Sequence, residues 1–383
     1  MARPPQVALL IETSSSYGRG LLRGISRYAR QHGPWSFFLE PGGQEETPPP
    51  LRDWGVDGVI TLFRTRQQAR RLLATRLPVV DLDFTIPGLV PWGVCNDEVG
   101  VARMAAEHLM SRGLRHFGFV GWSADEDSLW ESQRLETFTS TIERAGFPAS
   151  VYRRPALAWG REQQRLARWL ARLPRPAGIM ASNDQRARHV LEAARLAGLR
   201  IPDDLAVLGV DNDETLCELS TPSISSIALD TDTIGYEGAA LLHALMRKRK
   251  APRKPLLVPP LGVIARRSSD LLAMADPAVV AAVRFIEANL SKPIRIADVL
   301  RAAQLSRKTL ELRFRRSLGR TPHEELQRRR LEKMKALLRQ TDWPLKQIAR
   351  ATGFSYVEHL HKIFRQETGL TPTAFRAQGR GTP

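Results

Sequence analysis

The residues best suited to bind a small ligand stand where short apolar segments of the first 265 residues end. They supply carboxylates, amides, hydroxyls, one arginine and two indole rings. Such groups suit a sugar, because carboxylates and amides hydrogen-bond to neighbouring hydroxyls and an indole offers an apolar face to the ring. The candidates are residues 13–17 with Ser15 and Tyr17, then Asn96, Asp97, Trp122, Trp130, Arg134, Asn183, Asp184, Asp211 and Asn212.

A purely structural role is the alternative for several of these candidates. Ser, Asn and Asp after a strand often cap the next helix, and capping is as good an interpretation as ligand contact for Asn96, Asp97 and Asp184. Trp130 could instead pack in the wall of a cleft. Arg134 and Asp211 are the preferred contacts, because the motifs around them carry a resemblance that is described below.

The elements that must position these residues alternate between short β-branched runs and longer helical patterns from residue 7 to residue 264. This alternation is typical of an α/β fold with a parallel sheet, in which ligands bind beyond the carboxyl ends of the strands. Its length predicts two lobes. We expect strands at residues 7–11, 35–40, 57–63, 78–84, 116–121, 178–182 and 205–211 and at the end of 247–260, and helices at 18–32, 99–113, 131–146 and 185–198.

The chain changes character after this α/β region. Residues 1–265 are expected to form the effector domain, residues 266–277 a linker, and residues 278–383 an all-α domain. From Asp276 to the end there are 22 basic and 10 acidic residues, whereas the preceding residues hold 35 and 30. Most of the net charge of +17 therefore lies in the last third, which indicates contact with a polyanion such as nucleic acid.

The helical third contains one helix-turn-helix plan twice. The first unit has a helix at residues 296–303, a turn at Leu305 and Ser306, and a second helix; the second unit is LKQIARATGFSYVEHLHKIFRQETGLTP. Both units end with glycine followed by Thr-Pro, and a long helix at residues 323–340 joins them. A helix bundle with merely solvated charges is the alternative, but a matched tandem pair is a specific signal for DNA binding.

Helical periodicity separates the inner and outer faces of the two second helices. Leu310 and Phe314 face inward in the first, as do Leu360 and Phe364 in the last. The outer faces suit the major groove, where Arg and Lys reach guanine and phosphates and Glu accepts from cytosine. The expected DNA contacts are Arg307, Lys308, Glu311, Leu312, Arg315, Val357, Glu358, His361, Lys362 and Arg365.

Residues 276–376 resemble the AraC-type DNA-binding domain, whose second unit carries a signature similar to IARATGFSYVEHLHKIFRQETGLTPTAFR. The resemblance implies contact with two successive major grooves on one face of DNA. Leu312 departs from the family, in which a polar residue is commoner at this place. It is expected to touch a thymine methyl group or to make no base contact.

The α/β region resembles the LacI-type and periplasmic sugar-binding fold. The similar segments include CNDEVGVARMAAEHL, SQRLETF, GIMASNDQRARHVLEAARLAG and LAVLGVDNDE. The resemblance implies a sugar cleft between two lobes, lined by Arg134, Asp184 and Asp211 and, less directly, by Asn183.

A sugar-binding domain followed by an AraC-type domain resembles the family of xylose operon regulators. This likeness also selects Tyr17 and Arg19 in SYGRG as cleft candidates. It implies a regulator of transcription, with an activating role, that binds operator DNA, a xylose-like sugar and RNA polymerase as a homodimer. The sequence alone leaves the sugar, the operator and the balance of activation and repression open.

Other classes of protein fit the composition poorly. Two cysteines, Cys95 and Cys217, make a disulfide framework or four-ligand zinc site improbable, and no secretory signal or membrane span is recognisable, so a cytoplasmic protein is expected. A phosphate-binding glycine loop, a GxSxG elbow and a metal-ligand cluster are missing, so neither enzyme activity nor a cofactor is expected. A sugar-binding transport or sensor component is the alternative, but it has no use for the basic domain.

Overall fold

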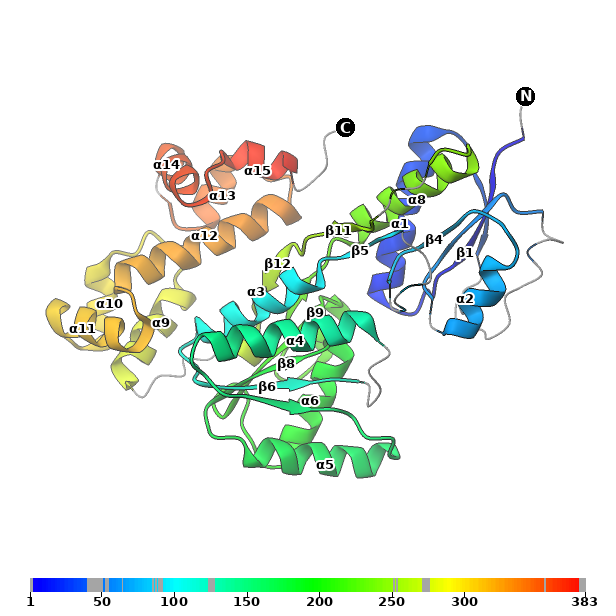
Figure 1. The fold of residues 1–383 in the computed structure, drawn as a ribbon. Helices are drawn as coiled ribbons and strands as arrows, with labels where there is room; N and C mark the ends of the chain where they lie inside the picture. Colours follow the sequence, from blue (N-terminus) through cyan, green and yellow to red (C-terminus); the bar gives the residue numbers. More distant parts are fainter. Residues whose placement is uncertain are drawn as a thin grey trace. The chain divides into compact units, whose positions relative to one another are not determined.

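The structure is a computed structural model that describes residues 3–39, 51, 55–63, 65–84, 86, 88, 92–122, 128–250, 252, 254–270, 276–354 and 356–378. The chain divides into two compact units (Figure 1). The first comprises residues 1–110 and 114–271, and the second comprises residues 111–113 and 272–383.

The first lobe of unit 1 contains a four-stranded parallel sheet in the order β2 (Ser36–Leu39), β1 (Gln6–Leu10), β3 (Gly58–Thr61) and β4 (Val79–Asp81). Its helices are α1 (Ser16–His32), α2 (Arg66–Leu73) and α8 (Thr231–Met246). Helices α1 and α8 lie against each other so closely that a Cβ atom at Gly24 would be 1.9 Å from the carbonyl oxygen of Asp232. Glycine is therefore required at this crossing.

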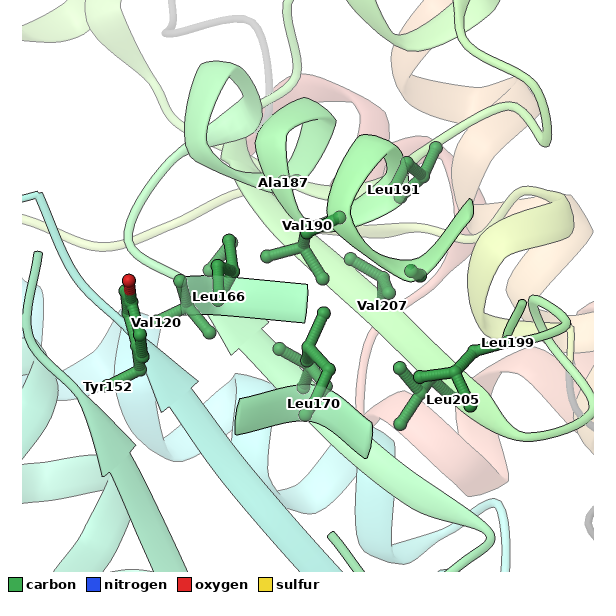
Figure 2. Close-up of a cluster of buried hydrophobic side chains, with 14 of the residues drawn as sticks. Val120, Tyr152, Leu166, Leu170, Ala187, Val190, Leu191, Leu199, Leu205 and Val207 are labelled. Atoms are coloured by element: carbon green, nitrogen blue, oxygen red, sulfur yellow. The ribbon is translucent and has the colours of Figure 1, made fainter. Parts of the chain in front are cut away.

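The second lobe contains a six-stranded sheet in the order β12 (Gly262–Ile264), β10 (Ser225–Ala228), β9 (Leu205–Asp211), β8 (Ala177–Ala181), β6 (His116–Val120) and β7 (Ala149–Tyr152). Only β12 among them is antiparallel to its neighbour. The helices of this lobe are α3 (Glu98–Met110), α4 (Leu129–Arg144), α5 (Trp159–Arg172), α6 (Asp184–Leu196) and α7 (Glu214–Leu219). Figure 2 shows the core in which Leu166 and Leu170 of α5 and Val190 of α6 pack over the sheet.

A further pair of parallel strands, β5 (Val94–Asn96) and β11 (Leu256–Val258), lies where the chain passes from one lobe to the other. The backbone N–H of Asp97 donates to the carbonyl of Val258, and that of Leu261 donates to the carbonyl of Ala228. These bonds tie the crossing segments together beside the cleft.

The described part of unit 2 contains α9 (Pro277–Ala288), α10 (Ile296–Ala303), α11 (Arg307–Leu318), α12 (Pro322–Gln340), α13 (Leu345–Ala351), α14 (Val357–Thr368) and α15 (Pro372–Gln378). They form two small apolar cores. Leu310 and Phe314 of α11 lie in the first, and Leu360 and Phe364 of α14 lie in the second, all fully buried as expected. Helix α12 contributes to both cores and so joins the two helix-turn-helix units, as predicted.

The predicted α/β and all-α order is confirmed, and α10 has the predicted bounds. Sequence patterns did not identify β5, β7, β10, β12, α2, α5, α7 or α8. The linker was expected to begin at residue 266, but residues 267–269 form the short helix η1 (Arg267–Ser269), which belongs to unit 1. There Ser268 is buried and its hydroxyl donates to the carbonyl of Val207 over 2.6 Å. Residues 271–275 of that linker lie outside the described residues.

Both cysteines are buried and free. In the described parts of the chain, no group of three or more His, Cys, Asp or Glu residues could hold a metal ion. Within the same limits, every helix is too short or too polar to cross a membrane.

Candidate functional site

A polar cavity of about 420 Å³ lies between the two lobes of unit 1, at the carboxyl ends of their strands. Both lobes supply hydrogen-bonding groups to it, and the side chains are of the kinds that recognise hydroxyl groups. The lining residues are Glu12, Ser14, Ser15, Tyr17, Asp83, Asn96, Glu98, Trp130, Arg134, Asn183, Gln185 and Asp211.

Arg134 on helix α4 is the charged donor that the second lobe places in the cavity wall. Its side chain is buried, with Nε donating to Glu98 Oε2 and Nη1 to the carbonyl oxygen of Ser182, each over 2.5 Å. The guanidinium also lies over the ring of Trp130, 4.8 Å from its centroid. Burial alone would lower the pKa of Arg134, but Glu98 and Asp211 outweigh it and raise that pKa. The site therefore holds a fixed cation beside two carboxyl groups.

Asp211 ends strand β9 in a strained backbone conformation, with φ of +104°, and Asn212 follows at +51°. Residues other than glycine rarely adopt such backbone angles, and each residue held in one costs on the order of 1–3 kcal/mol. Asn212 N donates to Ser226 Oγ over 2.9 Å, and this hydroxyl donates to Asp184 Oδ1 over 2.5 Å. Asp184 Oδ2 accepts from the backbone N–H of Asp213 over 2.7 Å. Asp184 thus holds the turn that presents Asp211 to the cavity.

Two carboxyl groups of the cavity, those of Asp211 and Glu98, have raised pKa values. Burial raises the pKa of Asp211 well above its ordinary value, with Arg134 opposing the shift. Burial also raises the pKa of Glu98, and again the charge of Arg134 offsets part of the effect. The protonation of these two carboxyl groups therefore sets how much negative charge faces Arg134 in the cavity.

The first lobe supplies a hydroxyl-rich wall. Glu12 accepts from Ser14 Oγ over 2.6 Å and from the backbone N–H of Ser15 over 2.9 Å, and it also accepts from Ser15 Oγ. The hydroxyl of Tyr17 accepts from Asn96 Nδ2 over 3.1 Å and donates to the carbonyl of Leu82 over 3.3 Å. These bonds fix the orientation of the groups that a ligand would meet.

The structure brings eight of the predicted candidates to the cavity: Ser14, Ser15, Tyr17, Asn96, Trp130, Arg134, Asn183 and Asp211. Two of the remaining candidates, Asp97 and Asp184, lie outside its lining. Asp184 is buried behind the wall and supports the turn of Asp211, whereas Asp97 caps α3 through a bond of 2.9 Å from the N–H of Gly100 to its Oδ1. Both positions favour the capping or supporting role that was the alternative to ligand contact for these two residues.

Two further predicted candidates, Arg19 and Trp122, do not line the cavity. Arg19 donates to the carbonyls of Thr13 and Ser14 instead of lining the cavity. The indole N–H of Trp122 donates to Asn183 Oδ1 over 2.8 Å, so Trp122 acts through its neighbour. The lining residues that the sequence analysis did not name are Glu12, Asp83, Glu98 and Gln185. Glu12, Asp83 and Glu98 each lie two residues after the last residue of a strand, and this position is the signal that could have found them.

The outer faces of α11 and α14 form a second candidate surface. Ser306 caps α11 by accepting from the N–H of Thr309 over 3.3 Å, and Gly319 and Gly369 end α11 and α14 with positive φ. The exposed predicted contacts are Arg307, Lys308, Leu312, Arg315, Glu358, Lys362 and Arg365. Three other predicted contacts, Glu311, Val357 and His361, are half-buried. Glu311 pairs with Arg307 over 2.9 Å, and Val357 packs against the second core.

Comparison with known proteins identifies both parts. A model of the periplasmic binding protein-like domain matches residues 106–269, and a model of the helix-turn-helix domain matches residues 299–378. The xylose operon regulatory protein of Haemophilus influenzae is 31% identical over 380 residues, which cover 97% of this chain and 98% of that one. This chain belongs to the family of xylose operon regulatory proteins.

Other members and solved structures agree with this family. The xylose operon regulatory protein of Escherichia coli K12 is 31% identical over 97% of this chain and 96% of its own length. The solved structure of a xylose-binding transcription activator covers 98% of this chain and 99% of its own, with a TM-score of 0.63 and 29% identity. A transcriptional regulator in complex with cellobiose, at 21% identity and a TM-score of 0.56, shares the fold of 70% of the chain. This regulator thus joins a sugar-binding type of domain to a helix-turn-helix DNA-binding domain.

Proposed function

We propose that the cavity of this transcriptional regulator binds xylose or a similar pentose, and that binding activates genes for sugar catabolism. The observation that carries the proposal is the position of Arg134 between Glu98 and Asp211 in a cavity that both lobes build. Neutral polyols need both donors and acceptors at short range, and this site offers a cation, carboxyl groups, amides and hydroxyls together. Xylose is chosen among the pentoses because the similar proteins are a xylose operon regulatory protein and a xylose-binding transcription activator.

In the proposed arrangement each lining residue makes a different kind of contact with the sugar. Arg134 donates to a sugar oxygen, Asp211 accepts from hydroxyl groups, and the ring of Trp130 faces the apolar side of the sugar. Asn183 and the hydroxyl-rich wall of the first lobe complete the contacts. The chain binds and releases the sugar without chemical change.

The second unit is proposed to place α11 and α14 in successive major grooves of operator DNA. Its exposed arginines and lysines supply phosphate and base contacts, and Leu312 lies open for a thymine methyl group. We further propose that the regulator acts in the cytoplasm as a homodimer and recruits RNA polymerase. A sensor or transport component without DNA binding is the competing function, and the basic outer faces of α11 and α14 argue against it.

A thermal-shift screen of the purified protein against pentoses and hexoses tests the sugar assignment. A sugar at 100 times its dissociation constant should raise the unfolding free energy by about 2.7 kcal/mol. We expect D-xylose to shift the melting temperature at lower concentration than its epimers or glucose. A protein that responds to none of the sugars would contradict the proposed ligand.

The same binding should depend on pH. The pKa of Asp211 is raised in the unliganded protein, and sugar hydroxyls donate best to its ionised form, so binding favours loss of the proton. Sugar affinity should therefore fall as the pH is lowered through the raised pKa of Asp211. In Asp211→Asn the affinity should be lower at every pH and its dependence on pH weaker. An unchanged pH profile in this variant would assign the dependence to another group.

A further inference from the structure

The outer face of α5 and the end of β7 form a groove of about 740 Å³ that none of the roles above uses. Leu166 and Leu170 turn into the core of the second lobe, as Figure 2 shows, so the opposite side of α5 faces outward. Arg161, Arg165, Arg168 and Arg172 line the groove at helical intervals of four, three and four residues, and all are exposed. Helical geometry therefore places four guanidinium groups in one row.

Within the part of the chain that the structure describes, this row of arginines has no acidic partner. Among the residues that the structure describes, no carboxylate forms an ion pair with any of these four arginines. The nearest acidic residue in sequence, Glu162, faces the interior and pairs with the buried Arg186 over 2.9 Å. Arg153 at the end of β7 adds a further cation to the lining of the groove. Like charges held this close repel one another, and a bound polyanion would relieve the repulsion.

The length of the row fits a DNA strand. Eleven residues of α-helix separate the first and last arginine, or about 16 Å along the axis. A DNA strand carries one phosphate about every 3.4 Å of the duplex axis, so the row extends along roughly five phosphates. Arginine is well matched to phosphate because its guanidinium donates two parallel hydrogen bonds. A protein partner fits less well, because it would need an equally regular row of carboxylates, whereas DNA presents phosphates at even spacing along its whole length.

We propose that this arginine groove, formed by Arg153, Arg161, Arg165, Arg168 and Arg172, binds the phosphate backbone of DNA that flanks the site held by α11 and α14. The inference rests on DNA binding by the second unit. Because one chain carries both surfaces, DNA held by one is present at high effective concentration for the other, and weak contacts then add measurably to affinity. The groove contributes no base recognition, only length and salt sensitivity.

The test compares two duplexes that contain the same binding site, enriched from a random library by the full-length protein. One duplex ends at the site, and the other extends it by about 30 base pairs on each side. The variant replaces the four arginines of α5 by glutamine (R161Q, R165Q, R168Q and R172Q). The matched control replaces four exposed arginines elsewhere in unit 1 (R66Q, R70Q, R71Q and R195Q) and so carries the same charge change.

On the long duplex, the groove variant should bind about tenfold more weakly than the wild type, and its log–log salt slope should be smaller by about 2 to 4. On the short duplex both proteins should bind alike, and the control variant should match the wild type on both. Equal losses in the groove and control variants would overturn the proposal, because net charge alone would explain them. Unchanged binding to the long duplex would also overturn it and would leave this face to an acidic protein or to solvent.

Failure of the wild type to bind the short duplex would count against DNA binding itself and so is distinguishable from failure of the groove. Thermal unfolding and sugar binding of each variant report whether it is folded. If the fourfold variant does not fold, R165Q with R168Q provides the same comparison at about half the expected change in slope.

Discussion

Replacing Arg134 by methionine should lower sugar affinity by about a hundredfold or more, because charge-assisted hydrogen bonds to the ligand are lost and Glu98 is left without its partner. Breaking a buried ion pair from one side costs about 3–5 kcal/mol. Arg134 is held in place by Glu98 and by the carbonyl of Ser182. No other described residue that lines the cavity is an arginine, lysine or histidine, so none can replace its positive charge. Calorimetric titration with D-xylose measures the loss.

Two variants separate binding from folding in this experiment. Arg134→Lys keeps the charge but not the fork of donors, so it should retain more stability while still binding the sugar weakly. Arg144→Met removes an exposed arginine from the same helix and should leave the affinity unchanged. Wild-type affinity in both Arg134 variants would show that the sugar binds elsewhere.

Replacing Arg186 by methionine should lower the unfolding free energy of unit 1 by about 3–5 kcal/mol, because the buried carboxylate of Glu162 then has no ion-pair partner. Arg186 is fully buried and donates to Glu162 Oε1 and to the carbonyl of Gly121, each over 2.9 Å. Seven of the eight tryptophans belong to unit 1, so tryptophan fluorescence during urea unfolding follows mainly this unit.

Two further variants test whether the unpaired Glu162 causes the loss of stability in Arg186→Met. Adding Glu162→Gln to Arg186→Met removes the unpaired charge and should recover much of the stability. Arg188→Met breaks a half-exposed pair with Glu192 on the same helix and should cost no more than about 1 kcal/mol. Equal costs for Arg186→Met and Arg188→Met would contradict the role assigned to the buried pair.

Local patterns were sufficient for the helix-turn-helix units. Their inward residues recur at helical spacing, their turns carry Ser306, Gly319 and Gly369, and each helix is held by neighbours close in sequence. The short strands were harder. β10 consists of SSIA and β12 of GVI, and such segments become strands only because the completed sheet supplies hydrogen-bonding partners. Helix α8 returns to the first lobe from far along the chain, and its local sequence does not show this.

The cavity illustrates the same limit at the level of single residues. Asp184 and Asp211 both follow apolar strands, yet one supports a turn from behind and the other faces the cavity. Both are aspartates near the end of an apolar strand, and only the folded structure shows that Asp211 ends β9 beside the cavity while Asp184 begins α6 and accepts from the N–H of Asp213. Glu98 was overlooked because a glutamate in the first turn of a helix is ordinarily a favourable surface residue.

The central claim is that the sugar in the cavity and the DNA on the helix-turn-helix helices influence each other through one protein. A sugar can shift DNA binding only through its differential affinity for two arrangements of the protein, and operator DNA must then change sugar affinity by the same factor. The direct test is calorimetric titration of D-xylose into the full-length protein with and without its saturating DNA site. We expect the DNA-bound protein to bind the sugar more tightly, by about 5-fold to 150-fold. Identical dissociation constants would contradict this account and would leave the two units as independent binding modules.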